Sequence, residues 1–182
     1  MPFYAYLLII VATVVWFYPF VPAHNKTPGA AVVNRRSRWG LLLQFIAYVL
    51  LWQGHFWLRS LPPWRLAVSV LLFALAIALS WTSSRDLTGQ LRIDAALGAE
   101  HRLVRSGVYG LLRNPIYTSM LLVDCATAII ITPWQLFVPA LILFIVGTEI
   151  RVRTEEMLLA ERFGEEFRQY KRSVSAYIPL LY

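Results

Sequence analysis

Two short stretches of this sequence concentrate residue types that can bind and position a polar ligand. The first is SGVYGLLRNPIYTSMLL, residues 106–122, where glycines, an Arg-Asn-Pro triplet and two tyrosines stand directly before or within an apolar run. The second is EIRVRTEE, residues 149–156, where arginines and glutamates follow another apolar run. Glycine lets a backbone approach a ligand closely, and carboxylates beside loop carbonyls suit a ligand with positive charge and amine or hydroxyl donors. The two stretches are therefore candidate walls of one binding site.

Each stretch also has a purely structural interpretation. Pro115 can simply start a helix, because proline is tolerated in the first helical turn and the residue before it is disfavoured in helical geometry. The arginines and glutamates of residues 149–156 have the i,i+4 spacing of solvated helix faces, where an exposed pair contributes only about 0.3–0.5 kcal/mol. A site exists only if the fold brings the two stretches together.

The composition indicates a membrane protein. Of the 182 residues, 58% are hydrophobic and 15% are charged, and the mean hydropathy is +0.58, whereas a typical soluble domain carries about 25% charged residues. The net charge of +7 is explained by cationic loops that contact anionic lipid, so we expect membrane lipids as partners and no nucleic acid. The single cysteine, Cys125, excludes an internal disulfide and a cysteine-based metal cluster, and no metal is expected.

Five segments are apolar enough to cross a bilayer, which takes about 20 residues and at least about 17. They are residues 3–21, 39–58, 64–81, 116–132 and 134–150. The last two are the shortest and are separated only by the turn around Pro133, so they predict a tight helical hairpin. The predicted fold is an all-α integral membrane protein with five transmembrane helices, a hairpin of spans four and five, and a C-terminal amphipathic helix.

The predicted amphipathic helix continues from span five and breaks near Gly164. Apolar residues recur there at roughly helical spacing between charged ones; they are Met157, Leu158, Phe163, Phe167 and Tyr170. We therefore divide the chain into residues 1–82, with three transmembrane helices, and residues 83–182, a catalytic half with a cytoplasmic loop, the hairpin and the amphipathic helix.

Lysines and arginines in the loops predict the orientation in the membrane. They are frequent after span one, sparse after span two, frequent in residues 83–114, absent from the hairpin turn and frequent after residue 150. Because cytoplasmic loops are enriched in these residues, we expect a multi-pass protein with its N-terminus outside and its C-terminal tail and site in the cytoplasm. The N-terminal segment lacks the positive start of a signal peptide, so cleavage is not expected. The hairpin then brings residues 107–115 and 149–156 to the same membrane face.

Two polar residues inside the predicted spans are candidate substrate contacts. Asp124 lies near the middle of span four, and its offset of seven residues from Tyr117 puts both on one helical face. Ionisable residues in spans usually face a cavity or a partner, so Asp124 contacts either a substrate or a neighbouring helix. His55, near the end of span two, has the same two interpretations, and an interfacial structural role is favoured for it.

The two stretches resemble motifs of the isoprenylcysteine carboxyl methyltransferase family, which in the broad sense includes phospholipid N-methyltransferases. GVYGLLRNPIYTS is similar to the family's G-x-Y-x-x-x-R-H-P-x-Y-x-G, and residues 151–170 are similar to R-x-x-x-E-E-x-x-L-x-x-x-F-G-x-E-Y-x-x-Y. Together the motifs cover most of residues 105–182. The resemblance implies an integral-membrane methyltransferase that uses S-adenosyl-L-methionine without a soluble dinucleotide-binding fold.

The resemblance also implies roles for individual residues. The cofactor pocket would contain Tyr109, Arg113, Asn114, Pro115, Tyr117, Glu155 and Glu156. Arg151 and Glu156 match the Arg and Glu near the family's reacting centre, and Arg153 is a second catalytic candidate because the register between the two arginines is open. The family's usual His is Asn114 here, which can hydrogen bond but cannot titrate near neutral pH. We expect this residue to hold the cofactor.

The favoured function is O-methylation of a carboxylate on an isoprenylcysteine-like or other lipidic substrate, either a small molecule or a prenylated protein. A carboxylate is nucleophilic at neutral pH and needs a cation to hold it, such as Arg151 or Arg153. The first alternative is N-methylation of a phospholipid ethanolamine head group, which would need a base, and Glu156 is the nearest candidate. The second alternative is a non-catalytic membrane scaffold with the same fold.

Overall fold

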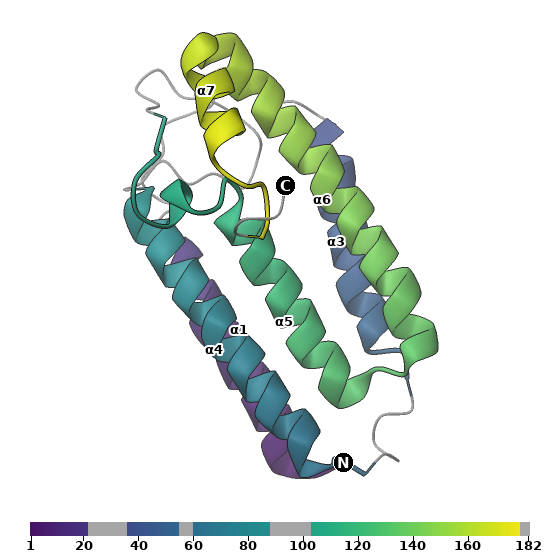
Figure 1. Cartoon of the computed structure of the whole chain (residues 1–182). Helices are drawn as coiled ribbons and strands as arrows, with labels where there is room; N and C mark the ends of the chain where they lie inside the picture. The colour runs from purple at the N-terminus through teal and green to yellow at the C-terminus, as the bar shows by residue number, and fades with distance from the viewer. Residues whose placement is uncertain (22–35, 55–59, 88–102, 179–182) are drawn as a thin grey trace.

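The computed structural model describes residues 1–21, 36–54, 60–87 and 103–178, which form a bundle of helices (Figure 1). The helices are α1 (Phe3–Phe17), α3 (Arg36–Leu51), α4 (Pro63–Asp86), α5 (Pro115–Ile131), α6 (Trp134–Phe163) and α7 (Glu165–Ser173), with a 3₁₀ turn, η2 (Gly107–Gly110). The described residues contain no strand, and an isolated parallel bridge joins Leu112 and Ser175. The predicted all-α class is confirmed.

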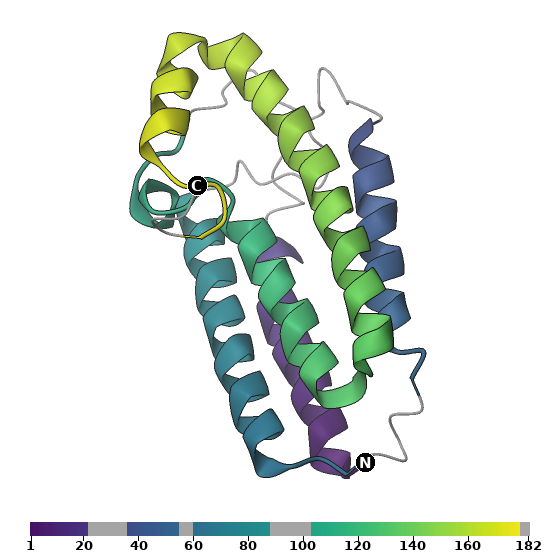
Figure 2. The same ribbon diagram turned by 45° about the vertical axis from the view of Figure 1, so that its right-hand side comes forward.

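Prolines and one glycine determine where the helices of the C-terminal half begin and end. Pro115 occupies the first turn of α5, and Pro133 immediately precedes α6. Proline suits these positions because its fixed φ matches a helix start and its missing N–H has no helical partner there. Helix α6 ends at Gly164, whose φ is +53°, a conformation that side chains disfavour. The predicted break at Gly164 is confirmed, and α7 turns back toward the bundle (Figure 2).

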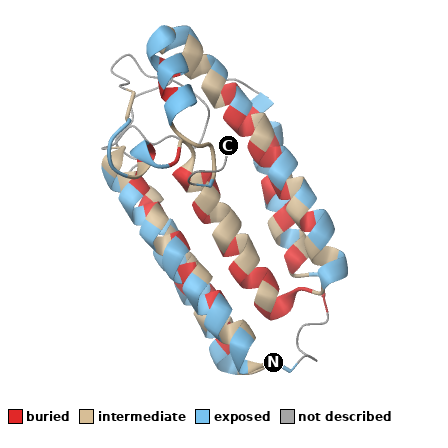
Figure 3. Ribbon diagram, viewed as in Figure 1, coloured by how far each residue is buried: buried red, intermediate tan, exposed pale blue. Residues whose placement is uncertain are grey.

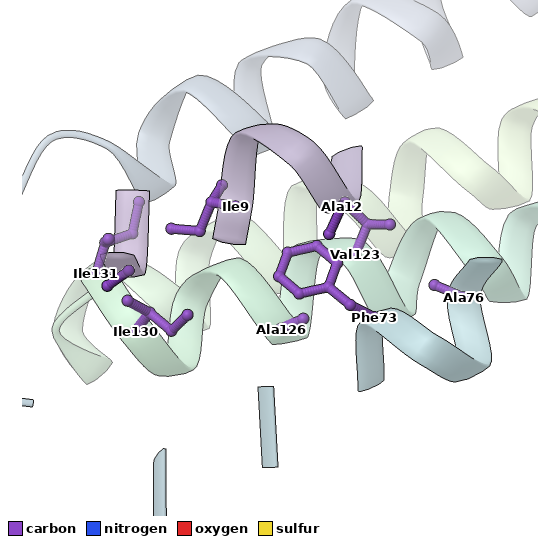
Figure 4. Packing of buried hydrophobic residues seen from close by; sticks show 9 residues of the cluster. Ile9, Ala12, Phe73, Ala76, Val123, Ala126, Ile130 and Ile131 are labelled. Carbon is purple, nitrogen blue, oxygen red and sulfur yellow. The ribbon is translucent and has the colours of Figure 1, made fainter. Parts of the chain in front are cut away.

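The helices pack as two groups. Helices α1, α4 and α5 form one group, and α3 and α6 form the other (Figures 1 and 2). The core of the first group is made of apolar side chains from all three helices (Figure 4): Ala5, Ile9, Ala12, Phe73, Ala76, Val123, Ala126, Ile130 and Ile131. The buried hydroxyl of Ser69 donates to the carbonyl of Ala126 at 2.8 Å, so α4 and α5 are joined by a satisfied polar contact as well.

Small residues allow α3 and α6 to approach each other closely. A Cβ on Gly147 would lie 2.7 Å from the carbonyl oxygen of Gly40, so the two backbones nearly touch. One turn further along, Gln44 Nε2 donates to Thr148 Oγ1 at 2.9 Å. Glycine contacts reinforced by an interhelical hydrogen bond are a common way to hold helices together in an apolar environment.

The predicted hairpin is present as a connection but not as a tightly packed pair. Helix α5 ends at Ile131 and α6 begins at Trp134, yet α5 packs along α4 and α6 packs along α3. A small apolar cluster of Leu51, Ala128 and Ala140 joins the two groups near the connection. Gly40 and Gly147 let α3 and α6 approach closely, and this accounts for the pairing of α6 with α3 in place of the predicted tight hairpin.

Much of the outer surface of the helices is exposed (Figure 3). The exposed residues include large apolar ones, such as Phe3 at 79% and Phe45 at 64% exposure. Exposed apolar surface on this scale indicates contact with lipid. Among the described residues, α4 and α6 are both long and apolar enough to cross a membrane, whereas α1 and α5 are apolar but shorter. The 15 residues of α1 extend about 22 Å, less than the hydrocarbon layer of about 30 Å.

The prediction of five transmembrane helices is therefore not confirmed. Helix α3 ends at Leu51, short of the predicted residue 58, after which residues 52–54 form a turn. The multi-pass topology and its orientation remain predictions.

The burial of Phe73 allows the packing of the α1, α4 and α5 core to be tested. Phe73 is 2% exposed, and Phe73→Ala should lower the free energy of unfolding by about 3–5 kcal/mol because it leaves a cavity. Phe45→Ala removes the same side chain from the outer face of α3 and should have a much smaller effect. Unfolding of both variants in the same detergent would be compared, and equal losses would contradict the described core.

Candidate functional site

The segment before α5 is fixed to the end of α4. The backbone N–H of Val108 donates to Asp86 Oδ2 at 2.8 Å. Gly107 has a φ of +61°, and a Cβ at this position would overlap the Asp86 carboxylate. Glycine is therefore required by the close approach of Asp86, a partner that the sequence did not identify, and this contact orients the chain that enters the site.

The 3₁₀ turn η2 is also fixed to α7. Tyr109 is buried, and its backbone carbonyl accepts a hydrogen bond of 2.7 Å from the hydroxyl of Tyr170. Burial raises the pKa of Tyr170 to about 12, and burial likewise raises the pKa of Tyr109 well above its ordinary value. Both phenols therefore stay protonated at neutral pH, and Tyr170 acts as a permanent donor.

Residues 174–178, which we name the C-terminal strap, run beside the start of α5. The backbone N–H of Arg113 donates to Ser175 O at 2.9 Å, and that of Asn114 donates to Ala176 O at 3.1 Å. The side-chain amide of Asn114 donates to the same Ala176 oxygen at 3.2 Å. In this structure Asn114 therefore holds the C-terminal strap, a role that requires a hydrogen-bond donor and no titratable group.

Glu156 of α6 is paired with two cations. Its Oε1 lies 2.5 Å from Arg113 Nη1, and its Oε2 lies 2.6 Å from Lys171 Nζ. The Arg113 side chain is 7% exposed and that of Glu156 is 17% exposed, so this is a largely buried ion pair. The contacts join the segment before α5, helix α6 and helix α7. Arg113 Nε is buried and has no hydrogen-bond partner among the described residues.

A second group of contacts joins α5 to α6. The Tyr117 hydroxyl donates to Glu155 Oε1 at 2.5 Å, and Arg151 Nε donates to the Tyr117 oxygen at 2.8 Å. The Arg151 guanidinium also lies over the Tyr117 ring, 5.6 Å from its centroid. Arg151 is 7% exposed, and burial strengthens each of these electrostatic contacts because water screens them less.

We name the residues of these two groups the polar cluster; they are Arg113, Tyr117, Arg151, Glu155, Glu156 and Lys171. The predicted meeting of the two sequence stretches is thus confirmed, although long side chains make the contact rather than closely packed helices. Cations and carboxylates alternate within the cluster, which suits a ligand that carries both charges.

The other predicted residues lie outside the polar cluster. Arg153 is paired with Glu149 at 3.1 Å, and its side chain is 79% exposed. The two arginines whose register the sequence left open therefore differ in the structure, because Arg151 is buried in the polar cluster and Arg153 is exposed outside it. Asp124 is half-buried on α5 and makes no hydrogen bond or ion pair with the residues that the structure describes. Pro115 is buried at the start of α5. His55 lies outside the described residues.

Sequence reasoning missed several residues that shape the site. Lys171 reaches Glu156 from α7, and the hydroxyl of Tyr177 in the C-terminal strap donates to Glu149 Oε1 at 2.9 Å. Burial and the bond to Glu149 raise the pKa of Tyr177 above its ordinary value. Only the break at Gly164 could have indicated these contacts, because it permits α7 to fold back on α6.

A helical bundle with exposed apolar surfaces and a buried polar cluster at one end indicates a protein associated with membranes. A sequence profile of the phospholipid methyltransferase family matches residues 64–166. This match covers more than half of the chain, from α4 into α7. The chain therefore belongs to the phospholipid methyltransferase family, and it is a membrane methyltransferase.

Individual relatives agree with this assignment. Protein-S-isoprenylcysteine O-methyltransferase A of Arabidopsis thaliana is 25% identical over 166 residues, which are 87% of this chain and 81% of that protein. Form B of the same organism is 25% identical over 144 residues, or 77% of this chain and 70% of that protein. The Schizosaccharomyces pombe protein of the same name is 31% identical over 85 residues, or 45% of this chain and 35% of that protein. The predicted resemblance is confirmed.

The pairing of Glu156 with two cations gives a stability test. Glu156→Gln removes the carboxylate charge and leaves Arg113 buried without its partner, so the variant should lose about 3–5 kcal/mol of unfolding free energy. Glu161→Gln, an exposed glutamate on the same helix, should change it by less than about 0.5 kcal/mol. Thermal unfolding of the two variants in detergent would be compared, and a similar small effect at both positions would argue against the ion pair.

Proposed function

We propose that the polar cluster is the active site of an S-adenosyl-L-methionine-dependent methyltransferase that O-methylates a carboxylate on a lipidic acceptor. The observation that supports this proposal is the buried Arg151, held against Tyr117 and Glu155 at the end of two apolar helices. An acceptor of the isoprenylcysteine type is favoured because the relatives from Arabidopsis and Schizosaccharomyces pombe are named for it. The acceptor is either a small molecule or a prenylated protein.

The residues of the polar cluster fit S-adenosyl-L-methionine. The methionine part of this cofactor carries a carboxylate and an ammonium group. The unpartnered, buried Nε of Arg113 suits the carboxylate, and Glu155 suits a cationic group. Tyr109, Asn114 and Pro115 form the backbone wall beside them, Tyr117 faces Glu155, and Glu156 keeps Arg113 in place. When bound, the cofactor supplies a methyl group on a positively charged sulfur.

Arg151 is the residue that we expect to hold the acceptor carboxylate. A guanidinium presents its donors in a planar fork that matches a carboxylate, and Arg151 is already oriented by its Nε bond and by the Tyr117 ring. A carboxylate needs no base, so the chain supplies orientation and a preorganised charge instead. Both oxygens of Glu156 are engaged by cations, and this argues against a role for Glu156 as the base that an amine acceptor would need.

The lipid part of the acceptor is proposed to lie within the bilayer, between the two helix groups. Asp124 follows Tyr117 by seven residues on α5, so both lie on one face of that helix. Its carboxyl has no bonded partner among the described residues, and a polar residue at membrane depth usually marks a ligand contact. Asp124 is therefore a proposed substrate contact, whereas His55 remains a candidate from the sequence alone, with an interfacial structural role favoured.

A phospholipid amine is the second candidate acceptor. The family that matches residues 64–166 is the phospholipid methyltransferase family, which favours an ethanolamine head group as the alternative to a carboxylate. The two reactions differ in the bond formed, an ester in one and a methylated amine in the other.

Cofactor binding and product chemistry test this function. Titration of the purified protein in detergent with S-adenosyl-L-methionine should give saturable heat, and no binding at millimolar cofactor would contradict both reactions. Labelled methyl transfer to N-acetyl-S-farnesylcysteine should give a base-labile product, as expected for an ester. A base-stable product from phosphatidylethanolamine, with none from the farnesylcysteine, would favour the amine reaction instead.

The two arginines of α6 give a matched pair of variants. Arg151→Ala should lower kcat/KM by about 10²–10³-fold, the loss typical of a removed electrostatic contact to the reacting group. Arg153→Ala removes an exposed side chain whose partner is Glu149, and activity should stay within about twofold, since exposed pairs contribute little. The reverse order of the two effects would assign the role to Arg153.

A further inference from the structure

The side chain of Arg151 is positioned by a glycine on another helix. A Cβ built on Gly40 of α3 would lie 2.6 Å from Arg151 Cγ and 3.4 Å from Arg151 Cδ. The first of these distances is far below a normal contact between carbon atoms, which is about 3.5–4.0 Å. The stem of the Arg151 side chain therefore occupies the space that any other residue at position 40 would fill.

The contact with position 40 involves the part of the Arg151 side chain that leads to its hydrogen-bonding atoms. Cγ and Cδ connect the α6 backbone to Nε, which donates to the Tyr117 hydroxyl at 2.8 Å. The guanidinium is confined on its other sides by the Tyr117 ring and by Glu155, 3.7 Å away. A shift of the stem away from α3 must therefore move the guanidinium relative to Tyr117, because the side chain has little space in which to rearrange.

The facing glycine of α6 provides a contrast. A Cβ on Gly147 would meet the Gly40 carbonyl oxygen, Leu43 Cβ and Gln44 Cγ, at 2.7, 3.1 and 3.2 Å. Both glycines thus support the close approach of α3 and α6, since the Gly40 Cβ would also lie 2.5 Å from the Gly147 carbonyl oxygen. Arg151 supplies two of the three atoms nearest to the added Cβ at position 40 and none of the three nearest at position 147.

We infer that Gly40 is a positioning residue for the methyl transfer reaction, and that it acts by leaving space for the stem of Arg151. The inference rests on the proposed role of Arg151 in holding the acceptor. It assigns a specific contribution to α3, a helix that lies outside the residues matched by the family profile and that contains none of the predicted site residues.

A double-mutant cycle separates this role from helix packing. Gly40→Ala and Gly147→Ala would each be made in the natural chain and in the Arg151→Ala variant, which lacks the atoms that an added methyl at position 40 would meet. We expect the fall in melting temperature caused by Gly40→Ala to shrink by at least about half in the Arg151→Ala background. The fall caused by Gly147→Ala should be the same in both backgrounds.

Activity gives the second measurement. With N-acetyl-S-farnesylcysteine as acceptor, Gly40→Ala should lower kcat/KM about tenfold or more below Gly147→Ala, because a displacement of about 1 Å in a positioned group has large kinetic effects. The affinity for S-adenosyl-L-methionine, measured by calorimetry, should differ by less than about twofold between these two variants. Equal kcat/KM values for them would overturn the inference.

The two measurements distinguish the inference from the proposed function. If the natural chain transfers no methyl group, the proposed function fails, while the melting temperatures still report whether position 40 acts through Arg151. Equal falls for Gly40→Ala in both backgrounds would overturn the inference even if the enzyme is active. If Gly40→Ala fails to fold, folding restored by Arg151→Ala would support the inference, and failure in both backgrounds would overturn it.

Discussion

The contact of Arg151 with Tyr117 and Glu155 is the interaction on which the arrangement of the molecule depends. Helices α1, α4 and α5 form one packed group and α3 and α6 form another, and a small apolar cluster of described residues joins these groups near the turn between α5 and α6. At the opposite end the connection is polar and mostly buried. The Arg113–Glu156 pair connects the segment before α5 to α6 at the same end, so the side chains that join the two groups there are also those proposed for catalysis.

The charged side chains of the polar cluster form specific pairs of opposite charge. Arg113 and Lys171 neutralise Glu156, while Arg151 lies beside Glu155. The two pairs of Glu156 join different elements, which fixes the segment before α5, helix α6 and helix α7 relative to one another, whereas Arg151 and Glu155 both belong to α6. A buried ion pair contributes little net stability but is costly to leave half-made. The polar cluster therefore fixes the relative positions of these elements more than it adds to the free energy of unfolding.

Local signals in the sequence were sufficient to predict the helix start at Pro115, the break at Gly164 and the meeting of Arg113 and Tyr117 with Glu155 and Glu156. These features depend on backbone preference and on chain reversal, which short patterns encode. The pairing of α6 with α3 was not predicted, because it depends on the glycines at positions 40 and 147, more than a hundred residues apart. Hydropathy likewise overestimated the lengths of α1 and α3, since apolar residues continue beyond the last helical turn.

The C-terminal strap has a consequence for biosynthesis. Asn114 bonds Ala176, which is 62 residues later in the chain, and Tyr170 bonds the carbonyl of Tyr109 across 61 residues. A ribosome produces the chain from its N-terminal side, so α1, α3, α4 and α5 are made before these partners. The segment before α5 therefore lacks these bonds until residues 170–176 have been made, and chains that stop before Ser175 lack the residues that hold the start of α5.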